Sequence, residues 1–168
     1  MPTHLNHVII APTSQTDLEA LAKLHAVVFG PGRFARTAYR VREGQPSISA
    51  FCRTAKVDGY LIASVTYTPI YIGARSGALL LGPLAVAGAY ANIGIGGKLI
   101  ATSLEAAKNE GIRLVVLVGE LAYYKRFGFV QVPPGQICLP GPADPARILA
   151  CKLDESAMCD YRGLISAF

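Results

Sequence analysis

Residues 78–111 read ALLLGPLAVAGAYANIGIGGKLIATSLEAAKNEG, which predicts a strand, a glycine-rich turn and a helix in succession. The apolar run 78–86 is typical of a buried strand, and the turn follows at residues 92–97. The helix repeats apolar residues every three to four positions and is expected to end at Gly111. Such a succession aims free backbone N–H groups and the positive end of a helix at an anion, usually a phosphate or pyrophosphate.

The spacing of the glycines excludes two common phosphate-binding loops. A Walker loop needs a glycine six residues before its lysine and Ser or Thr after it, but Lys98 has Asn92 and Leu99 at these positions. The dinucleotide fingerprint G-x-G-x-x-G starts at Gly94 and Gly96 and then meets Leu99. The turn therefore belongs to neither class.

Two blocks resemble the signature motifs of the GNAT N-acetyltransferases. In that family a strand ending in L-x-V precedes Q/R-x-x-G-x-G/A, and the counterparts here are LAV at 84–86 and ANIGIG at 91–96. The second block, GELAYYKRFGF at 119–129, is similar to the family's Tyr-x-x-x-Gly-Phe segment after the fifth strand. Small bacterial members also carry segments like PGRF at 31–34 and LPGP at 139–142, so the resemblance covers nearly the whole chain.

The resemblance implies one mixed α+β domain over residues 1–168, with helices on both faces of a mostly antiparallel sheet that is splayed between its fourth and fifth strands. The residues predict a first strand at 5–11, a helix with a capping box at Thr16 and Glu19, and a second helix at 33–42. Strands at 48–57 and 60–72 flank Asp58-Gly59, a strong hairpin signal, and the second of these strands alternates as if its two faces differed. A turn at 74–77, a strand at 147–153 and a terminal element at 155–168 complete the chain.

The resemblance also implies acetyl-CoA, or coenzyme A, as co-substrate. Pantetheine would lie between the fourth and fifth strands and pair with the main chain of the LAV segment, and the pyrophosphate would lie on the amides of the glycine turn. Gly94 and Gly96 would allow close approach of the backbone. Lys98 adds a contact to a phosphate or is an exposed lysine of the first helical turn. The expected cofactor-binding residues are Leu84, Ala85, Val86, Asn92, Ile93, Gly94, Ile95, Gly96, Gly97 and Lys98.

For catalysis the resemblance implies direct attack of an amine on the acetyl thioester, with a backbone N–H near Leu84 stabilising the oxyanion. Tyr124 matches the family tyrosine that faces the sulfur, so it is expected to be the general acid; the alternative is packing against neighbouring aromatic rings. Glu120 is the first candidate for the base, with capping of the following helix as its alternative. Glu43 is a weaker candidate, and a water chain is also compatible with this chemistry.

Arg33, Arg36 and Arg40 share one face of the expected second helix. They form either a solvated face or a gate that favours an acceptor bearing a carboxylate. In the resembling fold this region flanks the acceptor cleft, and the expected acceptor is an amine of a small molecule or a peptide.

Three departures from the family pattern lie around the turn. Ala91 replaces the usual Gln or Arg, Ile93 replaces a basic residue, and Gly88-Ala89 replaces Pro-Glu. The lost side-chain contacts are expected to weaken coenzyme A binding, although an amide cradle would remain. Besides an active N-acetyltransferase, the chain is therefore compatible with an acyl-CoA-binding module that lacks efficient catalysis, or with another class of nucleotide-binding protein.

The composition limits the ligands and the cellular location that we expect for this protein. The net charge of +5 suits an anionic ligand, but no basic run with interleaved aromatic residues favours nucleic acid. No apolar run reaches the ~18 residues of a membrane span and no signal peptide is recognisable, so a cytoplasmic protein is expected. The four cysteines have no metal-ligand spacing, and no metal is expected. A homodimer is compatible with a domain of this size.

Overall fold

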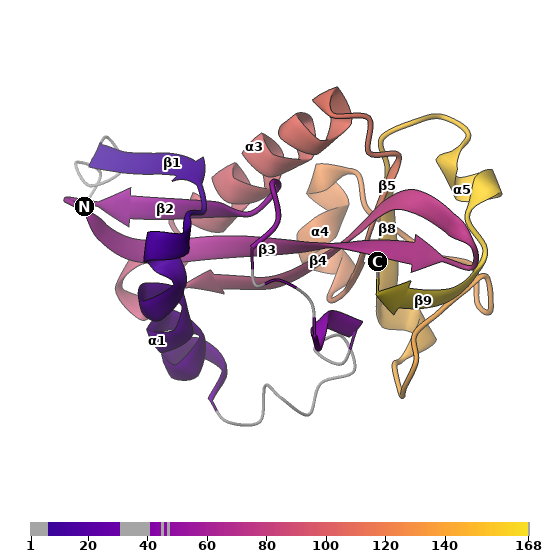
Figure 1. Cartoon of the computed structure of the whole chain (residues 1–168), viewed down its shortest axis with the longest axis horizontal. Helices are drawn as coiled ribbons and strands as arrows, with labels where there is room; N and C mark the ends of the chain where they lie inside the picture. Colours follow the sequence, from indigo (N-terminus) through magenta and orange to yellow (C-terminus); the bar gives the residue numbers. More distant parts are fainter. Residues whose placement is uncertain (1–6, 31–40, 45, 47, 168) are drawn as a thin grey trace.

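The computed structural model describes residues 7–30, 41–44, 46 and 48–167. Figure 1 shows one sheet with helices on either side of it. Its strands are β1 (Val8–Pro12), β2 (Arg53–Val57), β3 (Tyr60–Ile72), β4 (Arg75–Val86), β5 (Leu114–Val118), β6 (Val130–Gln131), β7 (Ile137–Cys138), β8 (Ile148–Lys152) and β9 (Gly163–Ala167). Its α-helices are α1 (Leu18–Phe29), α3 (Ile95–Asn109), α4 (Leu121–Tyr124) and α5 (Ala157–Asp160).

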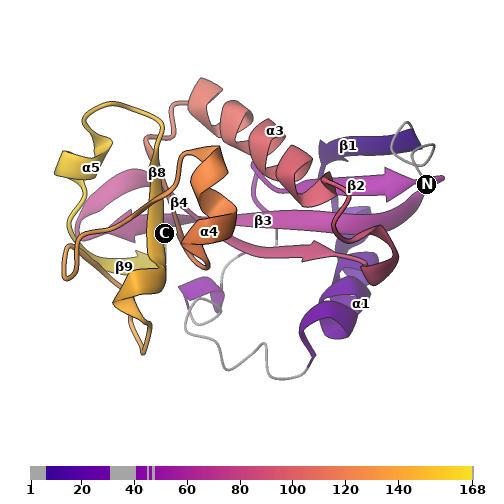
Figure 2. The same ribbon diagram turned by 180° about the vertical axis from the view of Figure 1, so that it is seen from behind.

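The sheet runs in the order β1-β2-β3-β4-β5-β8-β6, and β9 pairs with the end of β3 and with β7. Most pairs are antiparallel, whereas β4 and β5 are parallel. Helix α1 lies on one side of the central strands and α3 on the other, as the two opposite views show (Figures 1 and 2). The mixed α+β architecture expected from the sequence is confirmed.

Several local predictions are confirmed because they rest on backbone geometry. Asp58 and Gly59 both have positive φ, 52° and 83°, as a two-residue hairpin turn requires. Gly30 caps the C-terminus of α1, and Gly111 follows α3 with φ 84°. At each of these positions the type of residue was enough to predict a positive φ angle.

Other expectations were wrong in detail. The cap before α1 uses Ser14 and Asp17, not Thr16 and Glu19, because a 3-10 turn (Gln15–Asp17) precedes the α-helix. β2 begins only at Arg53, and the turn before β4 lies at Gly73 and Ala74. β3 does not have unlike faces, because α1 and α3 cover both sides and residues 62–65 are all buried. The second helix expected at 33–42 lies outside the described residues except for Val41 and Arg42, which are helical.

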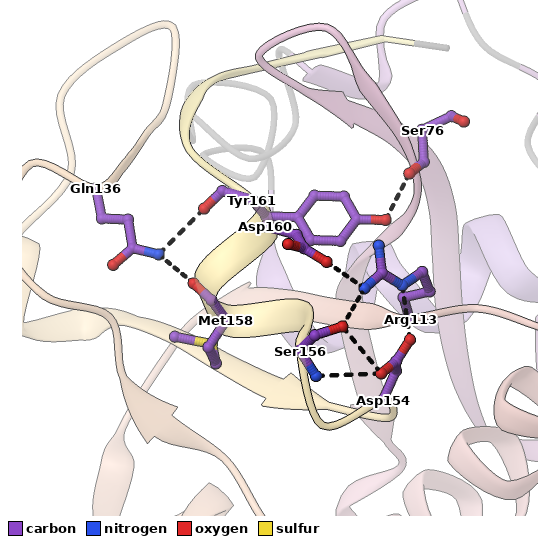
Figure 3. A network of polar contacts seen from close by, with 8 residues as sticks. All are labelled: Ser76, Arg113, Gln136, Asp154, Ser156, Met158, Asp160 and Tyr161. Atoms are coloured by element: carbon purple, nitrogen blue, oxygen red, sulfur yellow. Dashed lines mark hydrogen bonds and ion pairs between the residues drawn. The ribbon is translucent and has the colours of Figure 1, made fainter.

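The C-terminal segment is held against the sheet by a polar network (Figure 3). Arg113, just before β5, binds the carboxylates of Asp154 and Asp160, and its guanidinium lies 5.6 Å from the ring centre of Tyr161. The buried Tyr161 in turn donates its hydroxyl proton to the Ser76 carbonyl. These contacts anchor α5 and thereby place β9 beside β3.

Candidate active site

The parallel strands β4 and β5 separate partway along their length. β4 and β5 pair at Ala78–Leu114, Leu79–Val115 and Leu80–Val116, and no later pair follows. β4 nevertheless continues to Val86 and β5 to Val118. The outer half of β4 therefore has one edge that no strand of the described residues occupies.

A β-bulge decides which backbone groups of β4 lie on that edge. Between the pairs Val65–Leu84 and Tyr67–Leu81, β3 has one residue and β4 has two, Gly82 and Pro83. Beyond the bulge, the Ala87 N–H donates to the Ile62 carbonyl of β3 at 2.8 Å. Because backbone groups alternate along a strand, those of Ala85 also face β3.

It follows that Leu84 and Val86 turn their N–H and C=O groups away from β3, toward the open edge. An extended ligand lying along this edge could pair with both residues as an additional strand would. The bulge at Gly82 and Pro83 thus determines which residues of β4 present their backbone groups at this edge.

The N-terminus of α3 lies beyond the end of β4. Gly94 is the N-cap, with φ 91°, and no side chain caps the helix. The first bond of the helix runs from Lys98 N–H to the Gly94 carbonyl at 3.1 Å, so the amides of residues 95–97 have no partner within the helix. The first turn contains no acidic residue, and Lys98 is exposed. These free amides form a cradle for an anion.

The cradle and the open edge meet at Gly96. A methyl group at Gly96 would lie 3.7 Å from both Leu84 Cδ2 and Val86 Cγ2, in ordinary van der Waals contact. A single extended molecule that pairs with β4 would therefore reach the α3 amides at its anionic end. Asn92 (φ 63°) and Ile93 form the exposed outer wall of this cradle.

Tyr124 lies on α4, directly after β5. Its ring packs edge-on against Tyr123 and Phe129, with ring centres 4.9 and 5.7 Å away. Burial, with a smaller contribution from Tyr123, raises the pKa of Tyr124 to about 12. The hydroxyl therefore stays protonated at neutral pH, which is the form a general acid needs.

The Tyr123 side chain also reaches the cradle, which the sequence alone did not indicate. Its hydroxyl would lie 2.9 Å from a methyl group built at Gly96, and the Arg126 guanidinium covers its ring at 4.5 Å. The Tyr123 hydroxyl thus occupies the space beside Gly96 where a Cβ atom would lie, a contact between distant segments that local spacing does not reveal.

Glu120 is the N-cap residue of α4, but its side chain makes no capping hydrogen bond. The side chain is 73% exposed and pairs with Arg147, with Oε1 and Nε 3.4 Å apart. Both residues lie at the ends of neighbouring strands, because the Gly119 N–H donates to the Arg147 carbonyl at 2.9 Å. Glu120 thus holds an exposed carboxylate at the start of α4.

The three arginines of the expected gate, Arg33, Arg36 and Arg40, lie outside the described residues. Within the described ranges, no three His, Cys, Asp or Glu side chains are grouped so that they could hold a metal ion. No helix in that part of the chain is both long and apolar enough to cross a membrane.

A splayed parallel pair beside an uncapped helix defines the acetyltransferase class of fold that the sequence motifs indicated. The family model described as "Acetyltransferase (GNAT) family" matches residues 18–129. The chain belongs to this family. The expected type of enzyme, an N-acetyltransferase with acetyl-CoA as donor, is thereby confirmed at the level of the family.

Individual relatives agree with this assignment. The chain is 27% identical over 156 residues to the uncharacterized N-acetyltransferase YjhQ of Escherichia coli (strain K12), covering 90% of this chain and 86% of that protein. It is similar in fold to the GNAT family N-acetyltransferase YhbS of E. coli in complex with CoA (TM-score 0.82, 23% identity, 96% of this chain and 90% of that one). A GNAT family acetyltransferase from Brucella melitensis in complex with acetyl-CoA aligns with TM-score 0.62 and 27% identity, over 86% of this chain and 95% of that one.

Proposed function

We propose that this protein transfers an acetyl group from acetyl-CoA directly to an amine of a small molecule or peptide. The observation that carries the proposal is the junction at Gly96, where the open edge of β4 meets the free amides of α3. The complexes of the relatives with CoA and acetyl-CoA support it.

In this proposal the pantetheine arm pairs with the main chain of Leu84 and Val86. The backbone groups of Ala85 face β3, so Ala85 does not itself pair with the pantetheine arm. The pyrophosphate accepts hydrogen bonds from amides between Asn92 and Gly97, and Lys98 adds a positive charge. Only the Lys98 contact depends on a side chain, and the main chain makes all the others.

The acetyl group lies near the bulge, where the Leu84 N–H is the donor for the developing oxyanion. A neutral amine attacks the thioester carbonyl, the C–S bond breaks, and Tyr124 gives its proton to the departing thiolate. The nitrogen loses its second proton as the amide forms, and this proton returns Tyr124 to its protonated state through water. Glu120 is the first candidate to take the proton from the amine, directly or through water. Its exposed carboxylate, close to the end of β5 and paired with Arg147, supports this role.

For the acceptor we propose an amine that also carries a carboxylate, recognised by Arg33, Arg36 and Arg40. Support comes from Val41, just after these arginines, which is 4% exposed and belongs to the same cluster as Leu80 and Val116. Leu80 and Val116 are the last pair before β4 and β5 separate. Reversing the charge at Arg36 should therefore raise the acceptor's Michaelis constant and leave acetyl-CoA binding unchanged.

A second candidate function is acyl-CoA binding without efficient turnover. It is favoured by Ala91 and Ile93, which are exposed at the cradle and offer no charge to a phosphate. Retained acetyl-CoA binding with no thiol release across a broad panel of amines would select this alternative.

The decisive experiment is calorimetric titration of acetyl-CoA into wild type and an Ile93→Asp variant. Ile93 is exposed, so the change places a carboxylate at the cradle without a clash, which Gly96→Asp would not do because of Tyr123. Repulsion between this carboxylate and the pyrophosphate should weaken binding by about tenfold or more. Ile9→Asp, the same change at a 68% exposed residue of β1, is the matched control and should bind normally. A wild type that does not bind acetyl-CoA would refute the proposal.

A further inference from the structure

The bulge in β4 leaves a carbonyl that needs a partner outside the sheet. Gly82 has φ 135°, a conformation that favours glycine, and with Pro83 it stands opposite the single residue Thr66. The Gly82 carbonyl accepts a hydrogen bond from the guanidinium of Arg42, forty residues earlier in the chain. The contact is partly buried. The Arg42 guanidinium therefore supplies a hydrogen-bond donor to this carbonyl at the point where β4 leaves β5.

The position of Arg42 is set by its neighbour. Val41 is buried and belongs to the same hydrophobic cluster as Leu80 and Val116, the last paired residues of β4 and β5. Val41 is thus anchored in this cluster, and Arg42, the next residue, reaches the Gly82 carbonyl. Packing and a hydrogen bond therefore both hold this segment against the sheet.

We propose that Arg42 is a positioning residue for acetyl transfer: its hydrogen bond to the Gly82 carbonyl holds the outer half of β4 in the register that presents Leu84 and Val86 to acetyl-CoA. The proposal rests on the proposed function. A slip of one residue would turn Ala85 to the open edge and Leu84 toward β3. The Leu84 amide would then no longer face the thioester.

An arginine suits this task because its rigid fork of donors holds a fixed direction. A lysine can still donate to the carbonyl, but as a flexible point charge. Arg42→Lys is therefore expected to restore part of what Arg42→Met loses, whereas a role in bulk packing alone would make the two variants alike.

The test compares two ligands. Acetyl-CoA would pair with β4, whereas the phosphorylated ADP portion of coenzyme A, without its pantetheine arm, would contact only the α3 cradle. Arg42→Met should lower the affinity for acetyl-CoA about tenfold, as expected for weakened main-chain hydrogen bonds, and leave the affinity for the ADP portion unchanged. Arg42→Lys should lie between wild type and Arg42→Met.

Arg53 offers a matched control. It also donates to backbone carbonyls, those of Ala50 and Cys52 at 2.8 and 2.9 Å, but at the start of β2. Arg53→Met should leave both affinities unchanged. Equal acetyl-CoA affinity in Arg42→Met and wild type, or an equal loss for both ligands, would overturn the positioning role alone. A wild type that binds neither ligand would overturn the proposed function and this inference together.

Discussion

The hydroxyl of Tyr123 lies so close to Gly96 that a methyl group on the glycine would come within 2.9 Å of the oxygen. Gly96 belongs to the first turn of α3 and Tyr123 to α4, so the contact joins the anion cradle to the segment after β5. This contact is one reason why residue 96 is a glycine.

The first prediction tests that contact. Gly96→Ala should destabilise the protein by about 1 kcal/mol, at the lower end of overpacking costs, because the Tyr123 ring must move. In a Tyr123→Phe background the oxygen is gone, and the same change should be neutral or stabilising, since alanine is the better helix former. Denaturant unfolding of the four proteins gives the coupling energy.

Gly88→Ala is the control for this cycle. A methyl group at Gly88 would have no heavy atom of the described residues within 4 Å, and the residue has no positive φ, so its substitution should change the free energy of unfolding little. If Gly96→Ala were harmless both with Tyr123 in place and in the Tyr123→Phe background, the contact would not constrain the helix.

Sequence patterns predicted the parts of this molecule that depend on neighbours in the chain. The Asp58-Gly59 turn and the glycines that end α1 and α3 are local, because each residue type permits a rare φ. The glycine-rich start of α3 was also recognisable, and the structure leaves this helix end without a side-chain cap.

Features that arise between distant segments could not be predicted in this way. β9 adds to the end of β3 across almost a hundred residues, and Arg42 caps a carbonyl on β4. The contact between Tyr123 and Gly96 has the same origin. Each depends on packing between segments that are far apart in the sequence, which no local periodicity encodes.

The second prediction concerns pH and the network around Arg113. Its hydrogen bonds hold the pKa of Asp154 and of Asp160 below the usual range. A carboxyl whose pKa is lower in the folded state stabilises the fold above its unfolded pKa of about 4, and this contribution is lost as the pH falls through the folded value. Wild type should therefore lose stability on acidification below about pH 4 more steeply than Arg113→Met.

Thermal unfolding of both proteins across this range measures the effect. The difference in Tm should be largest near neutral pH and shrink in acid, as both carboxylates become protonated. Lys152→Met, which removes an exposed pair with Glu155, is the control and should leave the acid profile unchanged. A Tm difference that stays constant with pH would mean that Arg113 acts through its contact with the Tyr161 ring.

The third prediction concerns the packing that positions the Tyr124 side chain. A methyl group at Gly119 would lie 2.7 Å from Tyr124 Cε2 and 2.9 Å from Leu117 Cδ1. Both atoms belong to packed side chains, so Gly119→Ala should displace the tyrosine and cost about 1–3 kcal/mol of stability. Acetyl transfer should fall with it, even at temperatures where the variant is fully folded. Full activity in the folded variant would show that the position of Tyr124 is unimportant.

The fourth prediction assigns the general acid. Tyr124→Phe removes the proton donor but keeps the ring that packs against Tyr123 and Phe129, so acetyl-CoA should bind as before. Thiol release in the presence of an amine panel should slow by roughly a hundredfold, the usual contribution of a positioned acid. Because the pKa of Tyr124 is raised to about 12, its ionisation should cause no fall in the wild-type rate between about pH 7 and 10.

Tyr123→Phe is the control for this prediction. It removes a hydroxyl from the adjacent residue and should leave the rate of the chemical step near that of wild type. Equal thiol release by Tyr124→Phe and wild type would reduce Tyr124 to a packing residue and leave water to protonate the thiolate.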